Sequence, residues 1–531
     1  YNNTFNCYVL REYDGSHLQF PGLDRKRLGI DDLYSSQKNA AWRIIQNRGA
    51  LIDHEVGLGK TLTMVVASYE MKRLGIVSKP AILALKANVN QITEPYRKAY
   101  PAAKVLAPGE NDFTPAKRMR LYNEIKNNDW DCIILTHDQF GKIPQSSEIQ
   151  QEIFQTELDN IERDLYTLKE MGGSISRSML KGLEIRKNNL AIKLQGVLKD
   201  IQEKKDAGIN FRSLGIDHLF VDEAHKFKNL TFATRHDRVA GLGNKEGSQK
   251  ALNMLFAVRE LQAKFNSDLC VTFLSGTPIS NSLTEMYLLF KYLRPNELSR
   301  QHIENFDAWA AVFARKTVDF EFSVTNEIMA KERFRHFIKV PELALFYNEI
   351  TDYKTAKHIN LDKPELDEEL VNIKPTPDQQ EFIKKLMAFA KTGDGELIGR
   401  RPLTDEEDEG RMLIATNYAK KMAADMRLIN SFLYSDHPNN KVNVCARKIA
   451  ELYHSSTDHK GTQIVFCDIG TPKPDEFNIY DALKEKLQAD YDIPANQITF
   501  IHDWNERQKP ELFRKMNNGE IRILLGSTEK A

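Results

Sequence analysis

A glycine-rich turn that follows a short apolar run is the feature that most constrains the fold of this chain. The run Ala50 to Ile52 is typical of a buried strand. The turn after it contains Gly57, Leu58, Gly59, Lys60 and Thr61. Glycines let backbone N–H groups approach a phosphate, while a lysine and an adjacent hydroxyl supply a cation and a Mg²⁺ ligand. The pattern therefore predicts an α/β sheet with a loop that binds the phosphates of a nucleotide.

An acidic pair lies far downstream of this loop. Asp222 and Glu223 come directly after the strand-like run His218 to Val221. Hydrolysis of a nucleotide needs a carboxylate that holds Mg²⁺ and a second group that orients water. We therefore predict that Lys60, Asp222 and Glu223 are catalytic residues acting on ATP. Thr61 and Asp222 are the predicted Mg²⁺ ligands.

Short apolar runs alternate with helical patterns through the first part of the chain, which predicts a doubly wound parallel sheet. The further runs are 81–85, 132–136, 218–221 and 270–274. Ligands of such sheets bind outside the carboxyl ends of the strands. We therefore expect residues 57–61, Asp222 and residues 275–278 to meet in one crevice.

A long insertion separates two of these runs, and its apolar residues recur at helical spacing. They step by three and four between Phe154 and Leu168, and a second series follows between Leu183 and Ile201. The two series are separated by a break at residues 172–174. This pattern predicts an antiparallel helical hairpin over residues 145–212, although surface helices packed on the sheet remain an alternative.

The second half of the chain has a weaker pattern. Residues 301–440 are predicted to be mainly helical, with the charged stretch 405–409 as a solvated loop. Strand-like runs at 463–467, 497–501 and 521–525 indicate a second α/β unit that begins near residue 441. The glycine-rich segment 241–247 is predicted to be a flexible loop.

Composition excludes some function classes. The chain has 531 residues with 74 Lys and Arg against 74 Asp and Glu, so any surface that binds nucleic acid must be local. Its five cysteines are widely spaced, which favours free thiols in a reducing compartment. No apolar run approaches the roughly 20 residues that cross a bilayer. We therefore expect a cytoplasmic protein with no membrane partner.

The motifs and their order resemble those of the superfamily 2 helicase-like ATPases, and among these the Swi/Snf-related double-stranded DNA translocases. Residues 222–229 begin with the string Asp-Glu-Ala-His and are similar to the Walker B motif of that branch. The other similar segments are 33–37 (Q motif), 81–90 (motif Ia), 129–137 (motif Ib), 274–281 (motif III), 461–467 (motif IV) and 519–528 (the start of motif V).

The resemblance implies roles for further residues. The amide of Gln37 would contact adenine. His225 would couple the state of the nucleotide to motif III through Ser275 and Thr277. The residues that would contact the DNA backbone are Lys86, Thr136, Lys226 and Lys228, although the last two could instead serve as cations at a helix end.

The resemblance also implies a domain organisation. We expect an N-terminal extension over residues 1–32 and a first RecA-like lobe over 33–300 that carries the hairpin. A mainly helical region would follow over 301–440, and a partial second RecA-like lobe over 441–531. The expected function is an ATP-dependent motor that moves along duplex DNA.

The chain starts without methionine and ends soon after a strand-like run, so we interpret it as a fragment. It is similar to the helicase portion of large phage or plasmid proteins that also carry a DNA methyltransferase domain. The arginine of motif VI would then lie outside it, and we expect the fragment itself to hydrolyse ATP poorly.

Two other functions remain open. The Asp-Glu-Ala-His string also occurs in RNA helicases, so RNA is an alternative track. His54 stands where the complete phosphate-loop pattern has glycine. This departure leaves open an inactive scaffold that binds nucleic acid.

Overall fold

The computed structural model describes residues 11–170, 177–202, 208–232, 234, 242, 247–280, 282–322, 328–358, 366–473, 475–505, 508–528 and 530. The chain divides into two compact units. The first unit comprises Tyr1–Asp319 and Ala330–Lys363, and the second comprises Phe320–Met329 and Pro364–Ala531. The break at 172–174 and most of the segment 241–247 lie outside the described residues.

A seven-stranded sheet forms the centre of the first unit, and all of its strand pairs are parallel. The strand order is β3 (Val105–Leu106), β4 (Cys132–Thr136), β2 (Pro80–Ala84), β5 (His218–Val221), β6 (Val271–Ser275), β1 (Ala50–His54) and β9 (Thr351–Lys354). The edge strand β9 comes from beyond residue 300, where we expected the first lobe to end.

Successive residues of the central strands face two different cores. In β1, Leu51 packs in one apolar cluster, whereas Ala50 and Ile52 pack in the other. A strand that is covered on both faces is apolar at most of its positions, which is why these runs are visible in the sequence. The predicted α/β fold with a doubly wound parallel sheet is confirmed.

Helices cover both faces of this sheet. The face of Ala50 and Ile52 carries α3 (Ser35–Asn47), α4 (Lys60–Arg73) and α5 (Val89–Ala99). The opposite face carries α6 (Pro115–Asn127), α10 (Phe211–Leu214), α11 (Gln249–Phe265) and α12 (Leu283–Leu293). The remaining short elements of this unit are α2 (Arg25–Leu28), η1 (Glu110–Phe113), α7 (His137–Phe140), η2 (Ala224–Phe227), α13 (Pro295–Arg300), α14 (Phe306–Phe313), α15 (Val340–Asn348) and η3 (Ala356–His358).

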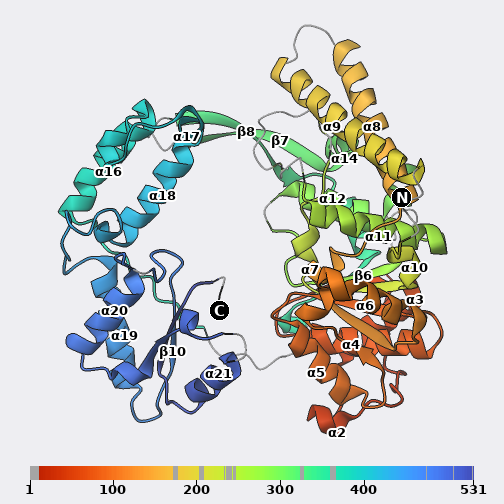
Figure 1. The fold of residues 1–531 in the computed structure, drawn as a ribbon, viewed down its shortest axis with the longest axis horizontal. Coiled ribbons are helices and arrows are strands. Elements are labelled where there is room, and N and C mark those ends of the chain that lie inside the picture. The colour runs from red at the N-terminus through yellow and green to blue at the C-terminus, as the bar shows by residue number, and fades with distance from the viewer. Residues whose placement is uncertain are drawn as a thin grey trace, which may run out of the picture. The chain divides into compact units, whose positions relative to one another are not determined.

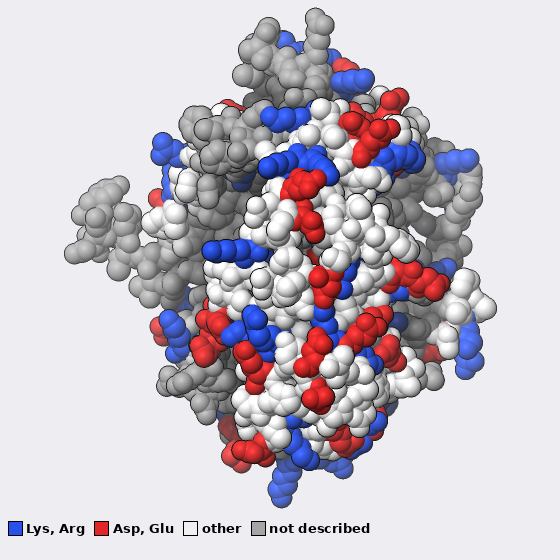
Figure 2. Space-filling view, turned by 90° about the vertical axis from the view of Figure 1, so that its left-hand side faces the viewer, with Lys and Arg blue, Asp and Glu red and all other residues white. Residues whose placement is uncertain are grey.

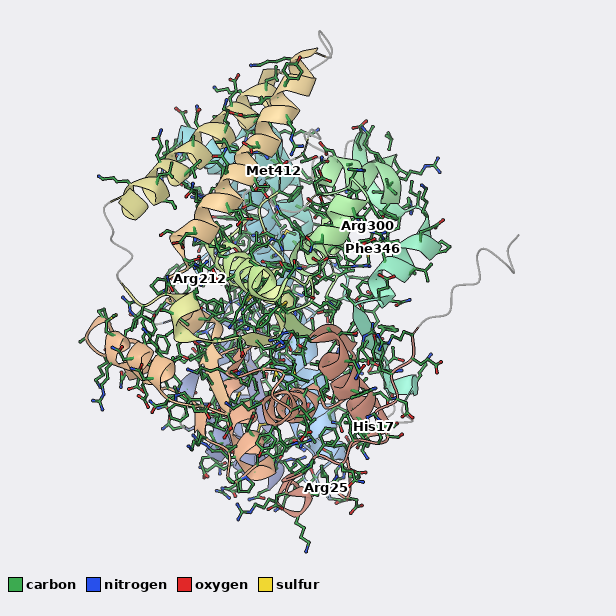
Figure 3. The ribbon with its side chains drawn as sticks, turned by 90° about the vertical axis from the view of Figure 1, so that its right-hand side faces the viewer. His17, Arg25, Arg212, Arg300, Phe346 and Met412 are labelled. Carbon is green, nitrogen blue, oxygen red and sulfur yellow. The ribbon has the colours of Figure 1, made fainter. Side chains whose placement is uncertain are left out.

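Two long helices, α8 (Ser147–Glu170) and α9 (Arg177–Gln202), lie side by side where we expected a helical hairpin (Figure 1). Ser146 directly precedes α8. Arg212, which is labelled in Figure 3, follows α9. Both side chains donate hydrogen bonds to the carboxylate of Glu260 on α11. One buried carboxylate therefore fixes both ends of the hairpin to the helix layer on the sheet.

The second unit contains a smaller parallel sheet, with β12 (Ile523–Gly526) between β10 (Gln463–Phe466) and β11 (Ile498–Phe500). This agrees with the second α/β pattern of the sequence. Its helices are α16 (Pro377–Thr392), η4 (Gly395–Ile398), α17 (Asp405–Glu409), α18 (Arg411–Ala424), η5 (Met426–Leu428), α19 (Lys441–Ser455), α20 (Ile479–Ala489), η6 (Ala495–Gln497), η7 (Ile501–Asp503) and α21 (Lys509–Asn517).

Two details of the region 301–440 differ from the prediction. Strands β7 (Ala314–Phe322) and β8 (Ile328–Phe337) form a two-stranded sheet in a segment that we expected to be mainly helical. The charged stretch 405–409, predicted as a loop, is the short helix α17. The Thr404 side chain caps it by accepting a hydrogen bond from the backbone of Glu407, and acidic residues in a first turn are stabilised by the helix dipole.

Basic and acidic side chains are interspersed on the face of the second unit shown in Figure 2. This pattern agrees with the balanced composition and offers no broad basic surface on the part of that face that is described. None of the described helices combines the length and the apolarity that a bilayer crossing requires.

Candidate active site

Three adjacent strands bring the predicted catalytic residues to one edge of the first sheet. The neighbours β5, β6 and β1 are parallel, so their carboxyl ends lie at the same edge. Asp222 follows β5, Ser275 ends β6, and the glycine-rich loop follows β1. The charge of Lys60 interacts with those of Asp222 and Glu223. The structure therefore brings together residues that are far apart in the sequence.

The loop after β1 has the backbone geometry that an anion site needs. Gly57 and Gly59 have φ values of +90° and +72°, which residues with a side chain rarely adopt. Gly59 is the N-cap of α4, and no side chain caps this end of the helix. The first N–H groups of a helix lack intrahelical partners, so they can bind phosphate oxygens. Leu58 is fully buried and anchors the loop, and Thr61 lies half-buried in the first turn of α4.

Lys60 is held against the backbone of its own loop. Its ammonium donates hydrogen bonds to the carbonyl oxygens of His54, at 2.8 Å, and Glu55, at 3.3 Å. Burial lowers the pKa of Lys60, whereas the nearby carboxylates of Glu223, Asp222 and Asp53 oppose this shift. The site therefore holds a cation next to acidic groups, which is the charge pattern that phosphates with Mg²⁺ require.

The two acidic residues differ in environment. Asp222 is 9% exposed, and its carboxylate accepts a hydrogen bond of 3.2 Å from the amide of Asn88. Burial raises the pKa of Asp222, and the charge of Glu223 adds to this effect. A hydrogen bond from His225 instead lowers the pKa of Glu223. The pKa values of these two neighbouring carboxyl groups are therefore shifted in opposite directions.

The residues predicted to couple the motifs are in contact. The Nδ1 atom of His225 lies 3.1 Å from a carboxylate oxygen of Glu223 and 3.1 Å from the hydroxyl of Ser275. Ser275 is fully buried, and its hydroxyl accepts a hydrogen bond from the backbone N–H of Thr277. A continuous path of contacts therefore links Glu223 to the segment that resembles motif III.

His54 points away from the phosphate loop. Its side chain is fully buried, and Nε2 lies 3.2 Å from the carboxylate of Asp352 on β9. The contact of His54 with Lys60 is made by its backbone carbonyl. The departure from glycine at this position therefore joins β1 to β9 and leaves the loop geometry intact.

Gln37 touches the loop as well as its own helix. Its Oε1 accepts a hydrogen bond from the Tyr34 backbone N–H, and its Nε2 donates to the carbonyl of Gly59 at 3.1 Å. The side chain is 3% exposed. An amide has two donor hydrogens and an acceptor with two lone pairs, so one donor and one lone pair remain for adenine. The adenine contact stays a prediction.

The four predicted DNA contacts fall into two groups. Lys86 and Lys226 are exposed at the surface. The Thr136 hydroxyl instead caps α7 by accepting a hydrogen bond from the backbone of Gln139. Lys228 is less exposed and forms an ion pair of 2.9 Å with Glu285. A DNA contact by Thr136 or Lys228 would therefore compete with an interaction that stabilises the fold.

Sequence reasoning missed Asn88, which orients Asp222. It lies in the segment similar to motif Ia, where Lys86 is the residue for which the sequence predicts a role.

Among the described residues, no group of three or more His, Cys, Asp or Glu side chains could hold a metal ion. The site still fits Mg²⁺, because this ion keeps several waters and binds one or two protein ligands together with phosphates.

We expect Gly59→Ala to weaken both the fold and nucleotide binding. A Cβ atom at Gly59 would lie 2.3 Å from Nε2 of Gln37, and the left-handed φ adds about 1–2 kcal/mol of strain. Gly57→Ala is the matched control, because its φ is also positive but no atom lies within 4 Å of the added Cβ. Urea unfolding and nucleotide titration should show a larger loss for Gly59→Ala. Equal losses would contradict the role of this contact.

We expect the first unit to lose stability as the pH falls below about 6.5. Burial lowers the pKa of His137 to about 4 and that of His218 to about 3. The unfolded chain therefore binds protons that the folded chain excludes, and each histidine costs about 2 kcal/mol at about pH 5. This loss of stability is absent at pH values above the pKa of a histidine in the unfolded chain. It is complete at pH values below the pKa values of the two histidines in the folded chain. Urea unfolding should show a smaller pH effect in His218→Leu, and an unchanged effect would contradict this account.

A comparison with protein families agrees with these motifs, since a family model described as a probable helicase domain matches residues 42–355. Among solved structures, the chain is similar to the Sulfolobus solfataricus SWI2/SNF2 ATPase core in complex with dsDNA, at 13% identity and a TM-score of 0.36 over 96% of this chain and 80% of that chain. It is also similar to the SWI2/SNF2 ATPase core domain of the same organism, at 13% identity and a TM-score of 0.35 over 98% and 81%. No curated protein matches the chain.

Proposed function

Because the chain belongs to the family of probable helicase domains, we propose that it binds and hydrolyses ATP with Mg²⁺ and thereby moves along double-stranded DNA. The observation that supports this proposal best is the convergence of Lys60, Asp222 and Glu223 at one edge of the sheet. An inactive scaffold would not need to preserve a cation, a buried carboxylate and an ionised carboxylate in one place.

Each residue of this edge has a distinct task. Lys60 and the first N–H groups of α4 bind the phosphate oxygens. Thr61 and Asp222 would hold Mg²⁺, which would offset the negative charge of the phosphates. Asn88 keeps the carboxylate of Asp222 in place. Glu223 orients the attacking water and takes up its proton.

We further propose that His225 and Ser275 report the state of this site to the rest of the chain. His225 contacts both the carboxylate of Glu223 and the buried hydroxyl of Ser275. Any displacement of Glu223 on hydrolysis therefore changes a contact with Ser275 at the end of β6. Two discrete arrangements of such a contact are what a motor needs to convert hydrolysis into movement.

The proposed DNA contacts are to phosphates. Lys86 lies in the turn after β2, and Lys226 lies in η2, which follows β5. Both lysines are exposed, and β2 and β5 are neighbouring parallel strands. Lysines that contact the DNA backbone contribute affinity without sequence information. Binding should therefore weaken steeply with salt and differ little among DNA sequences.

The test is ATP hydrolysis by the chain with duplex DNA, with RNA and with neither. Stimulation by duplex DNA alone supports the proposal. Stimulation by RNA alone would mean that the motor moves along RNA and not along DNA. Absence of nucleotide binding in a calorimetric titration with Mg²⁺ present would contradict the enzyme assignment and favour a scaffold.

A further inference from the structure

His137 connects the turn after β4 with the backbone of the acidic pair. It is 2% exposed, and its Nε2 lies 2.9 Å from the carbonyl oxygen of Asp222. Its Nδ1 lies 3.3 Å from the ammonium of Lys250 on α11. A carbonyl oxygen only accepts hydrogen bonds and an ammonium only donates them. The two partners therefore fix the imidazole as the neutral form with its proton on Nε2.

The Asp222 carbonyl belongs to the peptide that sets the direction of Glu223. Glu223 has φ +51°, a left-handed conformation that costs a residue with a side chain about 1–2 kcal/mol. Strand β5 ends at Val221, so this carbonyl lies beyond the hydrogen-bonded ladder. This carbonyl can therefore accept a hydrogen bond from a side chain elsewhere in the chain, and such a bond would hold the strained turn in place.

Lys250 is itself held in place. Its ammonium lies 5.0 Å from the centre of the Phe227 ring, which gives a favourable cation–π contact. The same ring meets the His137 imidazole edge to face, at 4.8 Å between centres. Phe227 is buried, and its ring contacts both other side chains, so the three pack as one cluster.

We propose that His137 and Lys250 are positioning residues for ATP hydrolysis. Lys250 selects the imidazole tautomer, and His137 uses its Nε2–H to fix the peptide between Asp222 and Glu223. The Mg²⁺ ligand and the water-orienting carboxylate then keep one relative orientation. This inference rests on the proposed ATPase function.

The buried histidine His218 provides a matched control. It is fully buried in the same sheet, and its Nε2 contacts the hydroxyl of Thr272 at 2.9 Å. It begins β5, whereas the acidic pair follows the end of that strand. Replacement of His218 therefore tests the cost of losing a buried imidazole without a change at the acidic pair.

The experiment compares His137→Leu, His137→Gln, Lys250→Met and His218→Leu with the unchanged chain. Gln restores one donor and one acceptor, and Met keeps the packing of Lys250 without its charge. A fluorescent ATP analogue measures affinity with and without Mg²⁺. Hydrolysis of pre-bound radiolabelled ATP measures the single-turnover rate, and thermal unfolding identifies the temperature range in which each variant is folded.

His137→Leu should lower the single-turnover rate at least about tenfold, as expected for loss of a residue that supports a metal site. Its affinity for the nucleotide without Mg²⁺ should stay unchanged. His137→Gln should recover most of the rate, Lys250→Met should be intermediate, and His218→Leu should match the unchanged chain.

Three results would overturn the inference. They are an unchanged rate in His137→Leu, an equal loss in His218→Leu, and no recovery in His137→Gln. Failure of the unchanged chain to bind the analogue would instead contradict the proposed function, so the two failures are distinguishable.

Discussion

A Lys60→Ala variant is expected to lose measurable ATP binding in a calorimetric titration, while its fold stays intact. The Lys60 ammonium is a cation that the structure places among the carboxylates of Asp53, Asp222 and Glu223. Without it, the phosphates would meet three carboxylates with mainly Mg²⁺ to offset the repulsion. A hydrogen bond to a charged group contributes about 1.5–3 kcal/mol, so loss of two phosphate contacts weakens binding by about 10² or more.

The loss of the lysine should not damage the fold. In the structure, the Lys60 ammonium donates to the carbonyls of His54 and Glu55. Because the residue is only half-buried, water can replace it as the donor to these carbonyls in the variant. The control is Lys98→Ala, which removes an exposed lysine from the last turn of α5. This control should bind ATP normally. Binding by Lys60→Ala within a few-fold of the unchanged chain would contradict the assignment of the phosphate loop.

A Glu223→Gln variant is expected to bind ATP normally and to stop hydrolysing it. Glutamine keeps the size of the side chain and an oxygen that can accept the hydrogen bond from His225, so the geometry of the contact to Ser275 should persist. The amide cannot take up a proton from water. Loss of a general base typically lowers the rate by about 10²–10⁴.

Single-turnover hydrolysis is the measurement for Glu223→Gln, because it detects slow chemistry on bound nucleotide. The control is Glu94→Gln, which neutralises an exposed carboxylate on α5. The two losses expected of Lys60→Ala and Glu223→Gln are different in kind, since one removes binding and the other removes chemistry. Turnover that survives in Glu223→Gln would mean that another group activates the water.

The apolar strands are the part of the fold that the sequence predicts well. β1, β2, β4, β5 and β6 are covered by helices on both faces, so most of their positions are apolar and each strand contains an apolar run. The edge strand β9 is not predicted, because it lacks an apolar run. Its sequence Thr351–Lys354 is polar, and only its first two residues are buried, so no apolar run marks it.

The candidate site also contains residues that the sequence predicts and residues that it does not. Lys60, Thr61, Asp222 and Glu223 lie in short motifs whose residue types and order by themselves indicate nucleotide chemistry. The supporting residues lack such a signal. The Asn88–Asp222 and His137–Asp222 contacts join segments that are more than 80 positions apart in the chain.

His54 illustrates why the local pattern alone is insufficient. In the sequence it is a departure from the phosphate-loop pattern, and one interpretation is decay of the site. In the structure its imidazole is buried against Asp352, which is 298 positions away. A motif records residue types along the chain, whereas the direction of a side chain depends on what packs beside it.

The sequence by itself determined the α/β class and predicted the phosphate loop and the acidic pair, because each depends on residues that are neighbours in the chain. Only the tertiary structure decided that these motifs share one edge, that β9 completes the sheet, and that Asn88 and His137 hold Asp222. Hydrogen bonds and burial act between residues that are close in space. When those residues are distant in sequence, no local sequence pattern indicates the contact.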